Sequence, residues 1–369
     1  DITVGMQQRV EILKMLYREN EILIFDEPTA VLTPQEIDEL MKIMRGLAAE
    51  GKSILFITHK LDEIKKVAGR CTVLRRGRWV GTVEVAGVNK ERLSEMMVGR
   101  KVSLTVAKPE REPGRVILEV NSLSVHDRRT GGQSVKGVSL KVREGEIVCV
   151  AGIDGNGQSE LVYALAGMLP AQSGTILIDG KDITGAGIRA RGMAGMAHIP
   201  EDRHRHGLIL DYTLSNNLVL QRYFEKRFGA GAFLDFGAIN DYSESLINRF
   251  DIRAGQRGRT VARSMSGGNQ QKAIVAREID RSPRLLIAVQ PTRGLDVGAI
   301  EYIHRQLVAV RESGCGVLLV SLELDEVMDV SDRILVFYEG AIVAEADPRE
   351  TSYQELGLYM AGGKRGESA

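Results

Sequence analysis

A glycine-rich segment at residues 152–159 has the composition of a phosphate-binding loop. Glycines allow successive backbone N–H groups to surround phosphate oxygens, and a helix that begins at Ser159 would point its positive end at them. Ser159 can also ligate Mg²⁺, whereas Gln158 stands where the phosphate-loop pattern has Lys and brings no positive charge. A tight strand-to-helix turn without a ligand is the alternative, and this segment alone does not decide. The residues expected to contact phosphate are Gly152, Gly155, Asn156, Gly157, Gln158 and Ser159.

A second segment, residues 265–272, places two glycines between a Ser and a predicted helix and reads Met-Ser-Gly-Gly-Asn-Gln-Gln-Lys. It precedes an apolar run at 285–288 that is typical of a buried strand. The segment resembles the Leu-Ser-Gly-Gly-Gln signature of the ABC ATPases, and the resemblance extends over nearly the whole chain. A glycine-containing helix cap is the alternative interpretation. The resemblance implies that ATP contacts Ser266, Gly267, Gly268 and Asn269.

Two carboxylates follow an apolar run near the N-terminus, where residues 22–28 read Ile-Leu-Ile-Phe-Asp-Glu-Pro. This pattern resembles the Walker B element of ABC ATPases, which implies that Asp26 holds the Mg²⁺ shell and that Glu27 polarises the attacking water. His59 follows a predicted strand at 53–58 and matches the family's switch His, which senses the γ-phosphate. Taken singly, the acids are also typical of helix caps and His59 of a solvated surface; their joint order and spacing favour the catalytic interpretation.

The two halves of the chain are related by a constant offset of 263 residues. Residues 5–9, Gly-Met-Gln-Gln-Arg, align with residues 268–272, Gly-Asn-Gln-Gln-Lys, and the shift continues without a gap to Gly77 and Gly340. Chance similarity would not keep register over such a length, so the pattern predicts a tandem repeat. The second copy has a glycine-rich loop well before its signature, whereas the first copy starts at the position equivalent to the signature. We therefore expect the sequence to begin inside the first domain.

The offset also compares the chemistry of the two copies. It pairs polar residues of the first copy with residues that lack their chemistry: Asp26 with Val289, Glu27 with Gln290, and His59 with Leu322. The signature is damaged in the first copy instead, where residues 3–7 read Thr-Val-Gly-Met-Gln, with a β-branched Val in place of Gly267. The family implies a head-to-tail dimer in which each ATP lies between the phosphate loop of one half and the signature of the other. All the losses then fall in one site, which predicts one hydrolytic composite site and one degenerate site.

The predicted fold class is α/β: a P-loop NTPase of the ABC type with an antiparallel β subdomain and a helical signature subdomain, present as a tandem repeat with an incomplete first copy. Apolar runs at 147–151, 285–289 and 317–321, each followed by a helical pattern, predict a mostly parallel sheet. Residues 175–178 and 334–338 are followed by Asp-Gly and Glu-Gly, which predict antiparallel hairpins. The predicted domains are residues 1–107 for the C-terminal part of the first ATPase domain, 108–115 for a linker, and 116–369 for a complete but degenerate second domain.

Composition narrows the class of protein. The 369 residues are enough for two to three domains, and 49 basic against 49 acidic residues leave no net charge that would attract nucleic acid or anionic lipid. No apolar stretch approaches the roughly 18 residues that span a bilayer. The three cysteines are too few and too scattered for a disulfide framework, which indicates a reducing compartment.

Within the family, the resemblance is strongest to the fused tandem ATPases of simple-sugar and nucleoside importers, and residues 200–208, Pro-Glu-Asp-Arg-His-Arg-His-Gly-Leu, look most like the nucleoside branch. It implies an energising subunit that uses ATP and Mg²⁺ and lies peripherally at the cytoplasmic face of the cell membrane. Its implied partners are two transmembrane permease subunits and, indirectly, an extracytoplasmic substrate-binding protein, with no nucleic acid. Two other classes stay open: a tandem ABC ATPase that acts on ribosomes or nucleic acid, and a structural nucleotide sensor. The first of these would favour a long charged inter-domain arm and two intact sites, and the sequence has neither.

Overall fold

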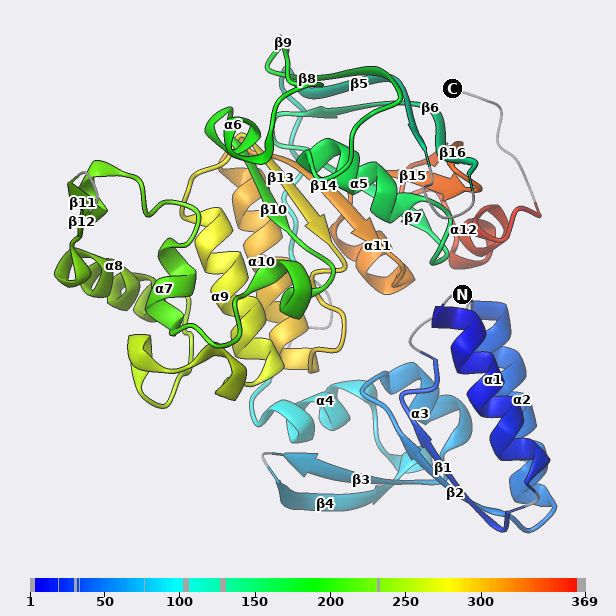
Figure 1. Ribbon diagram of the computed structural model, residues 1–369. Coiled ribbons are helices and arrows are strands. Elements are labelled where there is room, and N and C mark those ends of the chain that lie inside the picture. The colour runs from blue at the N-terminus through cyan, green and yellow to red at the C-terminus, as the bar shows by residue number, and fades with distance from the viewer. Residues whose placement is uncertain are drawn as a thin grey trace.

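The chain forms two structural units in the computed structural model, an N-terminal unit within residues 4–101 and a C-terminal unit within residues 116–363 (Figure 1). The structure describes residues 4–18, 20–29, 32, 34–75, 77–101, 106–126, 131–230 and 233–363. In the N-terminal unit β1 and β2 form a parallel pair, and β3 and β4 form an antiparallel hairpin. The elements of this unit are α1 (Val4–Tyr17), β1 (Ile22–Asp26), α2 (Pro34–Ala49), β2 (Ser53–Ile57), α3 (Leu61–Val67), β3 (Arg70–Arg75), β4 (Arg78–Glu84) and α4 (Lys90–Val98).

The C-terminal unit is built around a six-stranded sheet with the order β10-β13-β14-β7-β15-β16, in which only β16 runs antiparallel to its neighbour. A four-stranded antiparallel sheet, β6-β5-β8-β9, covers one side, and helices α7 and α8 lie beyond α9, which packs beside α10 (Figure 1). Its strands are β5 (Val116–His126), β6 (Gln133–Arg143), β7 (Ile147–Gly152), β8 (Ser173–Ile178), β9 (Lys181–Asp182), β10 (Met196–Ile199), β11 (Gly229–Ala230), β12 (Phe233–Leu234), β13 (Leu285–Val289), β14 (Gly316–Ser321), β15 (Arg333–Tyr338) and β16 (Ala341–Ala346). Its α-helices are α5 (Gln158–Ala166), α6 (Ile188–Met193), α7 (Leu214–Val219), α8 (Phe236–Arg249), α9 (Gly267–Ile279), α10 (Val297–Glu312), α11 (Leu324–Val330) and α12 (Tyr353–Met360).

The predicted parallel strands and hairpins are confirmed. The three apolar runs form β7, β13 and β14, and every residue of these strands is buried, because helices or a second sheet cover both faces of a parallel sheet. The two predicted hairpins are β8–β9 and β15–β16. Their turn residues, Asp179-Gly180 and Glu339-Gly340, all have positive φ, which matches the right-handed twist of the strands they join.

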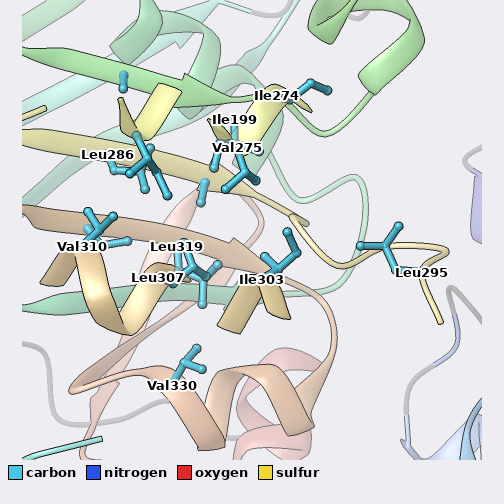
Figure 2. Close-up of a cluster of buried hydrophobic side chains, with 14 of the residues drawn as sticks. Ile199, Ile274, Val275, Leu286, Leu295, Ile303, Leu307, Val310, Leu319 and Val330 are labelled. Atoms are coloured by element: carbon cyan, nitrogen blue, oxygen red, sulfur yellow. The ribbon is translucent and has the colours of Figure 1, made fainter. Parts of the chain in front are cut away.

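Two hydrophobic clusters, one on each face of the central sheet, form the core of the C-terminal unit. On one face, Leu286 of β13 and Leu319 of β14 pack toward α10, which contributes Ile303 and Leu307, and toward α9, which contributes Val275 (Figure 2). On the other face, α5 and strands β5, β6 and β8 cover the sheet. The β7–α5 connection, which carries the glycine-rich loop, is therefore held between two packed layers.

The repeat predicted from the sequence is also a repeat of structure. Adding 263 to the bounds of β1, α2, α3 and β3 gives those of β13, α10, α11 and β15. Strand register is kept as well, since Ile22 pairs with Ser53 in β1–β2 and Leu285 pairs with Gly316 in β13–β14. The antiparallel pairs β3–β4 and β15–β16 even share a bulge, after Val73 in the first and after its equivalent Val336 in the second.

One face of the β1–β2 sheet differs from its counterpart in the second unit. Ile22 and Ile24 of β1 are 68% and 59% exposed, although the equivalent Leu285 and Ile287 of β13 are completely buried. In the second unit the cluster that contains α5, β5, β6 and β8 covers this face. The described residues of the first unit include no equivalent of this cluster on β1 and β2.

The described helices include none that is both long and apolar enough to cross a membrane. The three cysteines, Cys71, Cys149 and Cys315, are free thiols, and burial raises the pKa of all three.

The buried imidazole of His198 on β10 makes stability depend on pH. Its Nε2 is buried and has no hydrogen-bond partner among the described residues. Burial, with additional repulsion from His206 and Arg277, lowers its pKa to about 4. Between pH 6.5 and 4 the unfolded chain therefore binds a proton that the folded chain does not, so stability is lost as the pH falls. We expect the free energy of unfolding to fall by about 2 kcal/mol more in the wild type than in His198→Gln over this range. Urea titrations at several pH values measure the difference, and parallel curves for the two proteins would contradict it.

Candidate functional site

The predicted catalytic pair, Glu27 and His59, meets at the ends of β1 and β2. Glu27 Oε1 lies 2.9 Å from His59 Nδ1. Glu27 directly follows β1 and has a φ of +44°, a left-handed conformation that non-glycine residues adopt at some cost. Its N–H donates to the carbonyl oxygen of Ile57, the last residue of β2, at 2.9 Å. Asp26, the predicted Mg²⁺ ligand, ends β1 and is exposed.

A buried carboxylate, Glu63 of α3, connects the two loops that carry this pair. Thr29 Oγ1, two residues after Glu27, donates to Glu63 Oε1 at 2.5 Å, and Thr58 Oγ1, next to His59, donates to Glu63 Oε2 at 2.9 Å. Glu63 is only 3% exposed. Both of its oxygens are therefore used to hold the position of Glu27 and His59 relative to each other. Glu63 was not among the predicted site residues, although the Leu-Asp-Glu sequence that contains it recurs in the second copy at residues 324–326.

The loops after β13 and β14 of the second unit have the same backbone conformation and hydrogen bond as those after β1 and β2, but carry different side chains. Gln290 also has a φ of +44°, and its N–H donates to the carbonyl oxygen of Val320 at 2.7 Å. Thr292 Oγ1 donates to the buried Glu326 at 2.9 Å, as Thr29 does to Glu63. Gln290 is not a base, and Leu322 replaces the imidazole of His59. The loop after β1 and the loop after β13 therefore share a backbone conformation and differ in their side chains.

The glycine-rich loop has the backbone that phosphate binding requires. Gly155 and Gly157 have φ of +87° and +106°, and a Cβ atom at Gly157 would lie 2.1 Å from the carbonyl oxygen of Ser134. Asn156 fixes the loop to the β15–β16 turn, because its Oδ1 accepts from the N–H of Glu339 at 2.9 Å. The loop leads into α5, whose first turn leaves backbone N–H groups without helical partners. The local geometry therefore suits an anion with several oxygens.

The side chain of Gln158 is turned into this loop. It is 5% exposed, and its Nε2 donates to the carbonyl oxygen of Ile153 at 3.0 Å. A Cβ at Gly152 would lie 2.3 Å from the same Nε2, so this glycine makes room for the folded-back amide. The amide thus stabilises this conformation of the loop, a role that the sequence did not indicate.

Glu201 accepts hydrogen bonds from Ser159 and from two side chains of the loop after β13. Its Oε2 accepts from Ser159 Oγ at 3.3 Å, and its Oε1 accepts from Gln290 Nε2 at 2.9 Å and from Arg293 at 2.7 Å. Burial raises the pKa of Tyr163 on the same helix as Ser159, and the Glu201 carboxylate adds to this shift. Glu201 therefore links Gln290, the equivalent of Glu27, to Ser159, the Mg²⁺ ligand predicted in the loop. Arg293 was not singled out in the sequence, because its first-copy equivalent is Ala30.

The predicted signature residues lie at the start of α9. Ser266 is exposed, and its Oγ accepts from Asn269 Nδ2 at 2.8 Å, while Asn269 Oδ1 accepts from the N–H of Arg253 at 2.7 Å. A Cβ at Gly267 would lie 3.4 Å from the guanidinium of Arg203, whose pKa burial lowers, and one at Gly268 would lie 3.5 Å from Ala299. A Cβ atom at either position would thus make only ordinary van der Waals contact.

The structure brings Glu27 and His59 together. His59 also lines a cavity of about 480 Å³ together with Gly152 and Asp154 of the glycine-rich loop. Across the described residues, no hydrogen bond or ion pair joins Asp26, Glu27 or His59 to the signature. Of the damaged first-copy signature, Thr3 lies outside the described residues, and residues 4–7 form the first turn of α1.

The two predicted Mg²⁺ ligands lie in different units and both offer oxygen. Asp26 of the first unit supplies a carboxylate and Ser159 of the second supplies a hydroxyl, the hard donors that Mg²⁺ prefers. The described residues include no group of three or more His, Cys, Asp or Glu side chains that could hold a metal by themselves.

Comparison with known proteins finds relatives over the whole chain. A family model described as ABC transporter matches residues 135–293. The chain is 54% identical over 368 residues to the nucleoside import ATP-binding protein NupA of Lactococcus lactis subsp. cremoris (strain MG1363), covering 100% of this chain and 72% of the relative. It is 52% identical to the guanosine import ATP-binding protein NupO of Bacillus subtilis (strain 168), with the same coverage. It is 47% identical over 365 residues to the glucose import ATP-binding protein TsgD13 of Haloferax volcanii, covering 98% of this chain and 66% of the relative.

Solved ATP-binding cassettes share the fold. A dimeric post-hydrolysis structure of the cassette MJ0796 bound to ADP and Pi has a TM-score of 0.55 at 20% identity, covering 64% of this chain and all of that one. A nucleotide-free cassette from an ABC transporter has a TM-score of 0.53 at 20% identity, covering 63% and 91%. At these identities the likeness is one of fold.

The two hydrogen bonds that Glu63 accepts, from Thr29 and Thr58, predict that removing its carboxylate destabilises the N-terminal unit. Glu63→Ala leaves the Thr29 and Thr58 hydroxyls without their acceptor and is expected to destabilise the N-terminal unit by about 2–4 kcal/mol in urea unfolding. The neighbouring Asp62→Ala removes an exposed acid that pairs with Lys90 and is expected to cost less than about 1 kcal/mol. Equal losses in the free energy of unfolding for the two variants would contradict the bridging role of Glu63.

Proposed function

Because the chain belongs to the ATP-binding proteins of ABC transporters, we propose that it hydrolyses ATP to energise the import of nucleosides or simple sugars. The observation that carries this proposal is the 2.9 Å contact between the Glu27 carboxylate and the His59 imidazole at the carboxyl ends of two parallel strands. Ligands of open α/β sheets bind at this edge, and a carboxylate held there can orient a water molecule and accept its proton.

The hydrolytic site is a composite of the two units in this proposal. Asp26, Glu27 and His59 face the signature residues of α9, from Ser266 to Asn269. Support comes from the exposed Ser266 and from Gly267, whose missing side chain leaves room for a phosphate beside the first-turn N–H groups. Mg²⁺ bound with ATP neutralises charge on the phosphates, and Asp26 is the residue of this half that would hold it.

The site around the loop at residues 152–159 binds nucleotide without hydrolysing it in this proposal. The loss of a positioned base costs roughly 100- to 10,000-fold in rate, and Gln290 and Leu322 are both unable to accept a proton. Gln158 supplies no charge to the phosphates. The backbone cradle and the Ser159 hydroxyl, a potential Mg²⁺ ligand, are retained.

The predicted domains, residues 1–107, linker 108–115 and 116–369, are part of the same proposal. The exposed Ile22 and Ile24 of β1 correspond to strand residues that the second unit buries under its phosphate-loop helix and antiparallel sheet. A segment equivalent to residues 116–265 would cover this face and supply the phosphate loop of the first domain.

The proposed partners follow from the relatives, which are import proteins for a nucleoside, guanosine and glucose. We propose two transmembrane permease subunits, which hold the protein at the cytoplasmic face of the cell membrane, and a substrate-binding protein that acts on those subunits from outside. Closure of the two halves on ATP, and reopening after hydrolysis, would shift the permease between its access states. Because the nucleoside and guanosine import proteins are 54% and 52% identical to this chain and the glucose import protein is 47% identical, we propose nucleosides rather than sugars as the imported substrates.

The role of Glu27 can be tested in a chain lengthened by the first domain's phosphate-loop segment. Glu27→Gln removes the proton acceptor and keeps the phosphate contacts, so ATP turnover should be abolished while nucleotide binding is preserved or tightened. More than a tenth of the wild-type turnover would remove Glu27 from the role of base.

Gln290→Ala in the same lengthened chain is the matched control. An amide at this position accepts no proton, so turnover should change by less than about threefold. A hundredfold decrease would mean that the second loop belongs to the hydrolytic site and that the halves are assigned in reverse.

The chain of residues 1–369 makes a further prediction. Its acids, Asp26 and Glu27, belong to a half for which it contains no phosphate loop, and its only such loop, at residues 152–159, belongs to the half with Val289 and Gln290. We expect weak Mg-ATP binding at most and no hydrolysis above a blank without enzyme, because positioning the phosphates is most of what phosphoryl transfer requires. Adding about 140 residues at the N-terminus should restore both. Steady turnover by the unextended chain that is lost in Glu27→Gln would contradict the composite site.

A further inference from the structure

An ion pair between the two units joins residues at equivalent positions of the repeat. Lys60 Nζ lies 2.7 Å from Glu323 Oε2, and the two residues are separated by the repeat offset of 263. Their side chains are 22% and 40% exposed, so the pair is partly shielded from solvent. Each residue directly follows the position of the switch residue, His59 in the first copy and Leu322 in the second.

The helix contacts between the units have the same symmetry. Helix α4 contacts α10, and α2 contacts α12. The repeat offset relates α4 to α12 and α2 to α10, so each contact is the image of the other. An exchange of equivalent elements is the property of a two-fold axis. Lys60 and Glu323, as equivalent residues in contact, therefore lie at the pseudo-two-fold axis between the units.

The local structure on the two sides of this axis is also equivalent. The N–H of Lys60 donates to Thr58 Oγ1 at 3.0 Å, and the N–H of Glu323 donates to Ser321 Oγ at 3.1 Å. The ion pair thus joins two loops of the same shape. It lies in the wall of a cavity of about 480 Å³ between the units, which His59 also lines.

The charges at the axis are compatible with one pairing only. Two copies of the first unit would place Lys against Lys, and two copies of the second would place Glu against Glu, whereas unlike units place opposite charges together. A second ion pair between the units, Arg100 Nη2 to Glu301 Oε2 at 2.7 Å, does not join equivalent positions, and Lys66 pairs with Asp38 inside the first unit. The attraction between Lys60 and Glu323 is therefore specific to the contact between the two units.

We infer that the Lys60–Glu323 pair selects the association of unlike halves and that Lys60 is a positioning residue, which holds the loop of His59 against the second unit. The selection of unlike halves follows from the contact itself, whereas the effect on catalysis rests on the proposed function. The pair gives the degenerate half a direct contact with the loop that carries the switch His of the hydrolytic half.

The first test is a charge-reversal cycle in the 369-residue chain, read by hydrogen–deuterium exchange of residues 57–63. Lys60→Glu and Glu323→Lys should each speed exchange of this segment by about tenfold, although the second substitution lies in the other unit, and the double variant should return within twofold of wild type. Asp38→Lys, which reverses the pair with Lys66 inside the first unit, should change exchange by less than twofold. No change in the single variants, or no restoration in the double variant, overturns the ion pair. If a reversal prevents folding, the same cycle with Lys60→Ala and Glu323→Ala decides.

The second test measures ATP turnover in the lengthened chain. Each reversal should lower kcat by about tenfold with the KM for ATP within twofold of wild type, and the double variant should recover kcat. Restored exchange without restored turnover overturns the positioning role while leaving the ion pair. Failure of the proposed function is distinguishable from either result. In that case Glu27→Gln would have the same ATP turnover as the wild type, whichever charges stand at positions 60 and 323.

Discussion

The parallel pairing of one strand with the next is the constraint on which the candidate site depends. In β1–β2 the register pairs Asp26 with Ile57, so the residues that follow the two strands leave the sheet side by side. The N–H of Glu27 completes the ladder by donating to Ile57, and this bond holds Glu27 in its left-handed conformation. The imidazole of His59, two residues beyond β2, then lies within hydrogen-bond distance of the carboxylate. A slip of one residue would turn these side chains to the opposite face.

The same constraint operates in the second unit with different side chains. Gln290 repeats the backbone conformation of Glu27, and its amide nitrogen is used to bind Glu201 rather than to face an imidazole. Backbone geometry is thus retained where catalytic chemistry has been replaced, because the strand register and the buried Thr–Glu contact of each unit maintain the loops. This retained backbone is what the proposed nucleotide binding by the second unit requires.

The asymmetry of the two halves extends from the site to the contact between them. Fusion of two related domains in one chain allows equivalent positions to carry opposite charges, which a dimer of identical subunits cannot do at a two-fold axis. Lys60 and Glu323 use this freedom next to the two positions where the imidazole is present in one half and absent in the other. The residues that differ between the two halves of the proposed site and the ion pair between the halves are therefore neighbours in the chain.

The sequence by itself determined the family, the parallel strands at 285–289 and 317–321, the two hairpins and the repeat, because continuous apolar runs, turn residues and a constant offset are local or periodic signals. It also indicated that Glu27 and His59 act together, and the structure brings them into contact. Only the tertiary structure decided that Glu63 bridges Thr29 and Thr58, that Gln158 folds into its own loop, and that Lys60 meets Glu323. These contacts join side chains that are up to 263 residues apart or that choose among several rotamers, and no local pattern encodes such a choice.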